Sequence, residues 1–199
     1  MSKRVNILPV IDEENRVTGY YSYRDKEEFI DIKMRDITIV GMGYVGLTLA
    51  VAMSDIGFTV SGYDNNSQLI KKLKKGKTHF YEQGLQKYMD FFVWKKIKMS
   101  TDIEDVRGSV YVITVGTPMI KPQMTPNKQH ALEAMRVIGR VLSQGDLVIL
   151  RSTVPIGFCR KEAIPILEKE SGLKVGKDFY LAYAFERTTE GRRLKNYER

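Results

Sequence analysis

Apolar runs and amphipathic stretches alternate along most of this chain. Short apolar runs bounded by turn residues are typical of buried strands, and apolar positions that recur at helical spacing are typical of helices. On this basis strands are expected at residues 37–40, 58–63, 97–100, 109–115, 146–151 and 179–183. Helices are expected at residues 47–53, in the lysine-bearing stretch after Ser67, and at 85–93, 131–142 and 161–169. Strands that alternate with helices predict an α/β fold with a doubly wound, parallel, Rossmann-like sheet.

Residues 1–35 do not follow this alternation. A strand at 7–11, a turn at 12–15 and a returning strand at 16–23 would form a hairpin. The segment resembles the second half of a CBS module through Leu8-Pro9-Val10, Asp12, Gly19, Ser22 and Asp25. Half of such a module cannot enclose an adenosine. We therefore expect an extra N-terminal β-hairpin at 1–35, laid on the main domain or on a partner chain, and one main domain at 36–199.

The first strand–helix–strand unit carries the clearest functional signal. Its turn has a G-x-G-x-x-G pattern and reads Gly41-Met42-Gly43-Tyr44-Val45-Gly46. Gly41 permits the tight turn out of the strand, Gly43 lets the backbone approach a pyrophosphate, and Gly46 lets the helix pack closely on the sheet. The helix N-terminus then directs its unpaired N–H groups and its positive dipole end at the phosphates.

Asp64 completes this pattern. It follows the second strand, 18 residues past Gly46, where a carboxylate can accept hydrogen bonds from a ribose diol. A carboxylate repels a 2′-phosphate and no arginine follows nearby, so Asp64 favours NAD over NADP. The residues of the turn, Asp64 and Asn65 are therefore expected to bind NAD. The alternative is that the glycines only shape a turn.

Composition and charge narrow the classes of function. With 199 residues, 43% of them hydrophobic, the chain can bury one substantial core. The formal charge of +8 raises the alternative of a nucleic-acid partner, but the main lysine cluster, at 71–77, lies on a predicted amphipathic helix. We expect a solvated face there and no nucleic-acid partner. A basic surround also suits an anionic ligand such as a nucleotide sugar.

Three features that the sequence lacks exclude further classes of function: a membrane span, a pair of cysteines and a cluster of metal ligands. No apolar run approaches the roughly 20 residues that span a bilayer, so no membrane partner is expected. A single cysteine, Cys159, excludes an internal disulfide and fits the cytoplasm. His79 and His130 have no companions at metal-ligand spacing, and no metal site is expected.

From about Asp36 to Arg199 the chain resembles the N-terminal, NAD-binding domain of the UDP-glucose/GDP-mannose dehydrogenase family. Within the family it is similar to the branch that oxidises UDP-N-acetyl-hexosamines such as UDP-N-acetylmannosamine. The shared motifs follow in order: the glycine turn, Asp64, Glu82-x-Gly84-Leu85, V-G-T-P at 115–118, S-T-V-P at 152–155, and Glu186-Arg187 with Gly191.

This resemblance implies an activity and residues that perform it. Family members convert the C6 alcohol of a nucleotide sugar to a carboxylate, through two NAD-dependent hydride transfers, for polysaccharide biosynthesis. By resemblance, Thr117 and Thr153 would hold substrate or an ordered water at the nicotinamide end, and Glu186 would orient or activate water. Val115, Gly116, Thr117 and Thr153 would also contact the cofactor. The alternatives are that the threonines are strand-end caps and that Glu186 is a surface acid.

The departures from the family concern catalysis. The family's catalytic cysteine, with its lysine and aspartate partners, belongs to a later domain that this sequence does not contain. Cys159 lies after the S-T-V-P motif, where the family places no nucleophile, and a structural role is expected for it. Phe185 replaces the usual proline before the glutamate.

The resulting expectation is the NAD-binding part of a truncated or split UDP-sugar 6-dehydrogenase that does not complete the oxidation alone. A nucleotide-sugar substrate is expected, with a homodimer or a complementing catalytic chain as partner. The main alternative is a non-catalytic module that binds NAD or a nucleotide sugar. The basic balance leaves a nucleic-acid binder as the second alternative.

Overall fold

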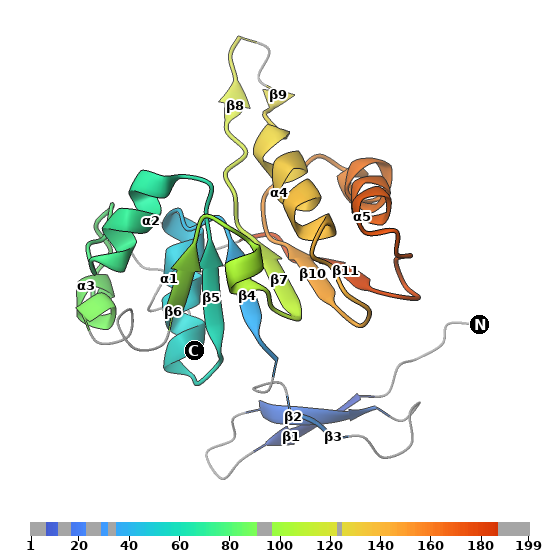
Figure 1. Ribbon diagram of the computed structural model, residues 1–199, viewed down its shortest axis with the longest axis horizontal. Coiled ribbons are helices and arrows are strands. Elements are labelled where there is room, and N and C mark those ends of the chain that lie inside the picture. Colours follow the sequence, from blue (N-terminus) through green and yellow to red (C-terminus); the bar gives the residue numbers. More distant parts are fainter. Residues whose placement is uncertain are drawn as a thin grey trace.

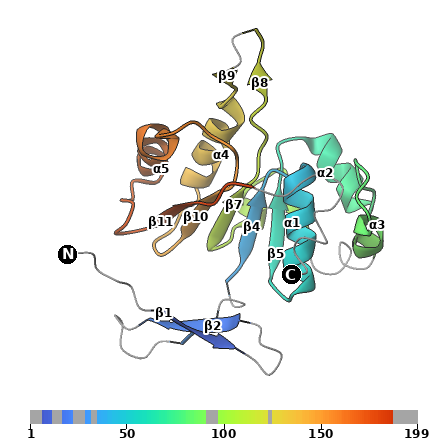
Figure 2. The same ribbon diagram turned by 180° about the vertical axis from the view of Figure 1, so that it is seen from behind.

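The main body of the protein is a six-stranded parallel sheet with helices on both faces (Figures 1 and 2). The computed structural model describes residues 35–90, 97–122 and 125–186, and the backbone alone of 7–11, 17–22 and 29–31. The strands of this sheet are β4 (Ile37–Val40), β5 (Val60–Tyr63), β6 (Ile97–Ser100), β7 (Val110–Ile113), β10 (Leu147–Leu150) and β11 (Tyr180–Tyr183). This architecture confirms the predicted doubly wound α/β fold.

The direction in which strands are added reverses beside β4. The order across the sheet is β11-β10-β7-β4-β5-β6, so the chain first builds outward from β4 through β5 to β6. It then crosses back to β7 on the other side of β4 and builds outward to β11. In an open parallel sheet such a reversal leaves a crevice outside the carboxyl ends of the two central strands.

Alternating strand residues supply two apolar cores, one on each face of the sheet. Ile37 and Ile39 of β4 join the core beneath α1 (Tyr44–Asp55), α2 (Ser67–Lys74) and α3 (Leu85–Tyr88). Val40 and Tyr111 join the opposite core, beneath α4 (Gln129–Gly139) and α5 (Ile164–Ser171). A short 3₁₀ turn (Glu104–Val106) and a π-helical turn (Cys159–Ala163) complete these connections. Figures 1 and 2 show the two helix groups on the two sides of the sheet.

Most predicted elements form, with shorter strands than the apolar runs suggested. The strand expected at 109–115 ends at Ile113, because the next residues turn toward the crevice. α2 begins after Asn66, whose side chain accepts hydrogen bonds from the N–H groups of Gln68 and Leu69 and so caps the helix. In the helix expected at 85–93, Leu85 and Met89 are buried, whereas Phe92 and Val93 lie outside the described residues.

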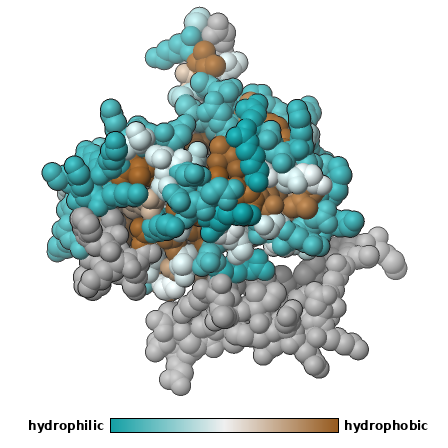
Figure 3. Space-filling model, in the orientation of Figure 1, coloured by the Kyte–Doolittle hydropathy of each residue, from teal (hydrophilic) through white to brown (hydrophobic). Residues whose placement is uncertain are grey.

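One hairpin of the main domain was not expected from the sequence. β8 (Met119–Ile120) and β9 (Thr125–Pro126) pair antiparallel and form a hairpin that projects beyond the sheet (Figure 1). Met119 and Ile120 are exposed, and Figure 3 shows apolar surface on this projection. Two-residue strands are too short for an alternating pattern, so the hairpin left no signal that periodicity could detect.

Ahead of the main sheet, β1 (Ile7–Ile11), β2 (Val17–Ser22) and β3 (Phe29–Asp31) form a three-stranded antiparallel sheet. β1 and β2 pair where the hairpin was expected, and β3 adds a third strand. The CBS likeness and the division into two domains stay predictions. In the described part of the chain, no helix has the length and apolar character needed to cross a bilayer.

Candidate functional site

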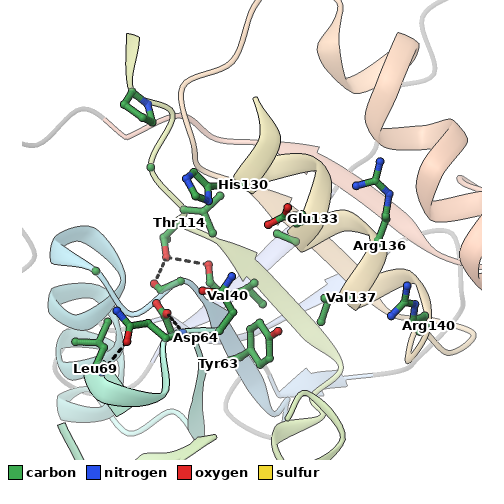
Figure 4. A pocket seen from close by; sticks show the side chains of 18 residues that line it. Val40, Tyr63, Asp64, Leu69, Thr114, His130, Glu133, Arg136, Val137 and Arg140 are labelled. Carbon is green, nitrogen blue, oxygen red and sulfur yellow. Dashed lines mark hydrogen bonds between the residues drawn. The ribbon is translucent and has the colours of Figure 1, made fainter. Parts of the chain in front are cut away.

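A cleft of about 570 Å³ opens at the carboxyl ends of β4, β5 and β7, where the strand order reverses (Figure 4). The glycine turn and the loop after β5 form one wall, and the loop after β7 and α4 form the other. Of the residues expected to bind the cofactor, the cleft is lined by Gly41, Gly43, Asp64, Asn65, Val115 and Gly116. The structure therefore brings together residues that are far apart in the sequence.

Each of the three positions in the turn is a glycine for a different geometric reason. Gly41 has a φ of +99°, a conformation that side-chain-bearing residues rarely adopt. A Cβ on Gly43 would meet no atom within 4 Å, so the backbone there is open to a ligand. A Cβ on Gly46 would lie 1.8 Å from the carbonyl oxygen of Gly41 and 2.7 Å from the hydroxyl of Thr114. Gly46 thus makes room for the turn itself, in addition to the predicted packing on the sheet.

Asp64 is anchored at the edge of the cleft by backbone donors. The N–H of Met42 donates to its Oδ2 at 2.8 Å, and the N–H of Asn66 donates to its Oδ1 at 2.8 Å. A carboxylate oxygen can accept more than one hydrogen bond, so both oxygens keep the capacity to accept from a ribose diol. Met42 takes part through this backbone bond, because its side chain is buried against Gly62.

α4 contributes a wall that sequence reasoning missed. His130, Glu133, Arg136, Val137 and Arg140 line the cleft from successive turns of this helix (Figure 4). No arginine lies close after Asp64 in the sequence, yet two arginines, Arg136 and Arg140, line the same cleft in space. Their helical spacing was the available signal, but only the crossing of α4 over the sheet shows which face meets the cleft.

A smaller pocket of about 250 Å³ lies next to the cleft and shares three of its lining residues, Thr114, Val115 and Gly116. Its other lining residues are Val45, Thr117, Arg151, Ser152, Thr153 and Glu186. The three residues expected to be catalytic, Thr117, Thr153 and Glu186, are therefore brought together, and the predicted Val45 lies here as well.

Two hydrogen bonds join the strand-end loops that form this pocket. The hydroxyl of Thr117 donates to the carbonyl of Thr153 at 2.7 Å, and the hydroxyl of Ser152 donates to the carbonyl of Val115 at 2.7 Å. The loops after β7 and β10 thus hold each other in place. Ser152 is buried and serves this connection, whereas Thr117 and Thr153 keep oxygens at the pocket.

Glu186 lies in the pocket as half of an ion pair. Its Oε2 accepts from the Nη2 of Arg151 at 2.6 Å, with only 11% of the Glu186 side chain and 22% of the Arg151 side chain exposed. The backbone N–H of Glu186 also donates to the carbonyl of Arg151. Arg151 was not predicted to be a site residue, although it directly precedes the S-T-V-P motif.

Tyr44 and Cys159 line neither the cleft nor the smaller pocket. The hydroxyl of Tyr44 donates to the buried Glu82, and its ring centroid lies 4.3 Å from that of Phe80. Any phosphate contact by Tyr44 therefore comes from its backbone, at the start of α1. Cys159 packs at the edge of the α4–α5 core, and burial raises the pKa of its thiol. A nucleophilic cysteine needs the opposite shift of the pKa.

The cleft fits a dinucleotide. The open space at Gly43 admits a diphosphate at the N-terminus of α1, and Asp64 offers carboxylate oxygens at the end of β5. The smaller pocket continues the cleft past Thr114, Val115 and Gly116, toward the residues expected at the nicotinamide end. When bound, NAD supplies a hydride acceptor.

Comparisons with known proteins agree with this geometry. Residues 35–199 match the NAD binding domain of the UDP-glucose/GDP-mannose dehydrogenase family. UDP-N-acetyl-D-mannosamine dehydrogenase from Pyrococcus horikoshii is 37% identical over 161 residues, which are 80% of this chain and 38% of that protein. UDP-N-acetyl-D-glucosamine 6-dehydrogenase from Salmonella typhi is 35% identical over 156 residues, covering 78% of this chain and 36% of that protein.

Solved structures show the same relationship. The P. horikoshii enzyme superposes with a TM-score of 0.75 at 35% identity, over 81% of this chain and 38% of that chain. A ternary complex of GDP-mannose dehydrogenase from Pseudomonas aeruginosa gives a TM-score of 0.76 at 32% identity, over 81% of this chain and 38% of that chain. The chain thus spans well under half the length of these relatives. It belongs to the UDP-glucose/GDP-mannose dehydrogenase family and carries that family's NAD-binding domain.

Proposed function

We propose that this chain is the cofactor-binding part of an enzyme that oxidises the C6 alcohol of a UDP-sugar to a uronic acid, for polysaccharide biosynthesis. The observation that carries the proposal is the continuity of the two pockets. Thr114, Val115 and Gly116 line both, so a dinucleotide in the cleft would extend toward Thr117, Thr153 and Glu186. The relatives that act on UDP-N-acetyl-hexosamines suggest the substrate class.

In this proposal the pocket residues position the reacting alcohol and water. The hydroxyl of Thr117 donates its proton to Thr153, so its oxygen lone pairs stay available to accept from a substrate hydroxyl or a water. Glu186 would orient a water near the reacting carbon. Arg151 holds that carboxylate in place through a charge-assisted hydrogen bond.

Completion of the oxidation would need a nucleophile that the described residues do not offer. The half-buried Cys159 lines neither pocket, and burial raises the pKa of its thiol, which disfavours the nucleophilic thiolate. We therefore propose a second module, either a complementing catalytic chain or a further part of a homodimeric enzyme. A cytoplasmic location suits the single free cysteine and a nucleotide substrate.

Calorimetric titration of the chain with NAD, repeated with NADP, tests the cofactor half of the proposal. Saturable binding of NAD, weaker binding of NADP and loss of NAD binding in Asp64→Ala are expected. Asp55→Ala, which removes an exposed acid at the end of α1, is the matched control and should bind as the unchanged chain does. Absence of NAD binding would refute the proposal.

A non-catalytic module that senses NAD or a nucleotide sugar is the second candidate. It is favoured by the absence of a reactive cysteine from both pockets as described. The two candidates differ in the effect of adding the cysteine-bearing domain of a relative in trans. NADH formation from UDP-N-acetylmannosamine supports the enzyme, whereas NAD binding without any turnover supports the module.

A further inference from the structure

The peptide unit between Gly41 and Met42 is held at both ends by side chains that directly follow two other strands, β5 and β7. Its carbonyl accepts from the hydroxyl of Thr114 at 2.7 Å, and its N–H donates to Asp64 at 2.8 Å. A trans peptide directs its C=O and N–H to opposite sides. Thr114 and Asp64 therefore hold one plane from two sides, and Figure 4 shows both side chains in the cleft, with the hydrogen bonds of the Thr114 hydroxyl.

The Thr114 hydroxyl donates its hydrogen bond chiefly to the carbonyl of Gly41. The carbonyl of Val40, 3.3 Å away, already accepts the backbone N–H of Thr114 at 2.9 Å, so the shorter contact to Gly41 is the better use of the single hydroxyl proton. Thr114 is only 7% exposed, and its oxygen would lie 2.7 Å from a Cβ on Gly46. The Thr114 hydroxyl and the Gly41 carbonyl thus fill the space that a Cβ on residue 46 would occupy.

We propose that Thr114 is a positioning residue for the cofactor, acting through the Gly41–Met42 peptide on Asp64 and on the diphosphate-facing turn. The proposal rests on NAD binding in the cleft. Without the hydroxyl, the buried carbonyl of Gly41 would lose its partner and the peptide could rotate. Rotation would break the hydrogen bond from the Met42 N–H to Asp64. The Asp64 carboxylate, which accepts from the ribose, and the backbone that faces the diphosphate would then no longer be held in fixed positions relative to each other.

Three variants test this proposal in the full chain. Thr114→Val removes the hydroxyl and keeps the shape, and Thr114→Ser keeps the hydroxyl. Thr38→Val is the matched control, because Thr38 is fully buried on β4 and its hydroxyl likewise donates to a carbonyl, that of Val106. If Thr114→Val does not fold, Thr114→Cys, which offers a weaker donor, replaces it.

Two readouts are needed. The Kd for NAD should rise roughly 3- to 10-fold in Thr114→Val, the range given by losing one neutral hydrogen bond. Thr114→Ser and Thr38→Val should stay within about twofold of the unchanged chain, although both valine variants lower the melting temperature. Exchange of the Met42 amide hydrogen, followed by NMR without ligand, should accelerate in Thr114→Val and not in Thr38→Val.

The proposal is overturned if Thr114→Val binds NAD as tightly as Thr38→Val does, or if its Met42 amide stays as protected. Failure of the unchanged chain to bind NAD would instead refute the proposed function. Amide exchange would then still decide whether Thr114 holds the turn, because that readout needs no ligand.

Discussion

Gly43→Ala should separate ligand binding from folding. The φ of Gly43 is −68°, its ψ is −159°, and the position that a Cβ would take has no neighbour within 4 Å. Alanine adopts such an extended conformation without strain. Alanine also reduces the conformational freedom of the unfolded chain, which stabilises the folded variant by about 0.4–1 kcal/mol. Alanine is a poorer N-cap for α1, which costs a similar amount, about 0.5–1 kcal/mol. We expect the melting temperature to change by less than about 4 °C.

Binding of NAD should respond very differently. The new methyl group would stand in the open space that faces the cleft, where the diphosphate is expected to approach the backbone. A rise in the Kd for NAD of at least about tenfold, or roughly 1.4 kcal/mol, is expected. Calorimetric titration measures the Kd, and differential scanning calorimetry measures the stability of the same sample.

Gly46→Ala is the contrasting variant. Its Cβ would lie 1.8 Å from the carbonyl oxygen of Gly41, and no flexible side chain can yield there because the clash is with backbone. Overpacking of this kind costs about 1–3 kcal/mol, which lowers the melting temperature by roughly 2–12 °C. If Gly43→Ala bound NAD as the unchanged chain does, or if Gly46→Ala were as stable as Gly43→Ala, the geometric reasoning would be refuted.

Three further outcomes are expected. Because burial raises its pKa, the Cys159 thiol should react with a disulfide reagent at mildly alkaline pH more slowly than the same thiol in the urea-unfolded chain; equal rates would contradict this. Burial, and secondarily the charge of Lys72, lowers the pKa of His79 from 6.5, so unfolded chains gain a proton first as the pH falls below 6.5. Unfolding free energy should therefore decrease on acidification from that pH, by a smaller amount in His79→Gln, as urea titrations at several pH values would show. Arg151→Gln removes the guanidinium from Glu186 and should lower the unfolding free energy by roughly 1–3 kcal/mol, between the values for exposed and buried pairs; a urea midpoint equal to that of the unchanged chain would contradict this.

Patterns that repeat along the chain were sufficient to predict the fold. The strand, glycine turn and helix from Ile37 onward are local features, and each is fixed by neighbouring residues. Strand ends were predicted less well, since Thr114 and Val115 continue the apolar run of β7 in sequence but turn toward the cleft in space. The β8–β9 hairpin was missed because its strands have no detectable period.

The residues of the candidate site also differ in how well the sequence predicts them. Asp64 and the glycines were predicted because the motif fixes their spacing, whereas their partners were not. The hydroxyl of Thr114 lies 73 residues along the chain from the carbonyl it binds. The arginines of α4 enter the cleft only through the angle at which that helix crosses the sheet. Contacts of this kind are properties of packing, and no local pattern records them.

The two backbone bonds accepted by Asp64 have a consequence for redesign of coenzyme preference. Replacing this acid to admit a phosphorylated ribose would also remove the acceptor of the Met42 N–H and loosen the turn. A workable exchange keeps a side-chain oxygen at position 64, as serine or asparagine would. Two arginines already line the opposite wall of the cleft, Arg136 and Arg140, and the second of them also pairs with Glu170.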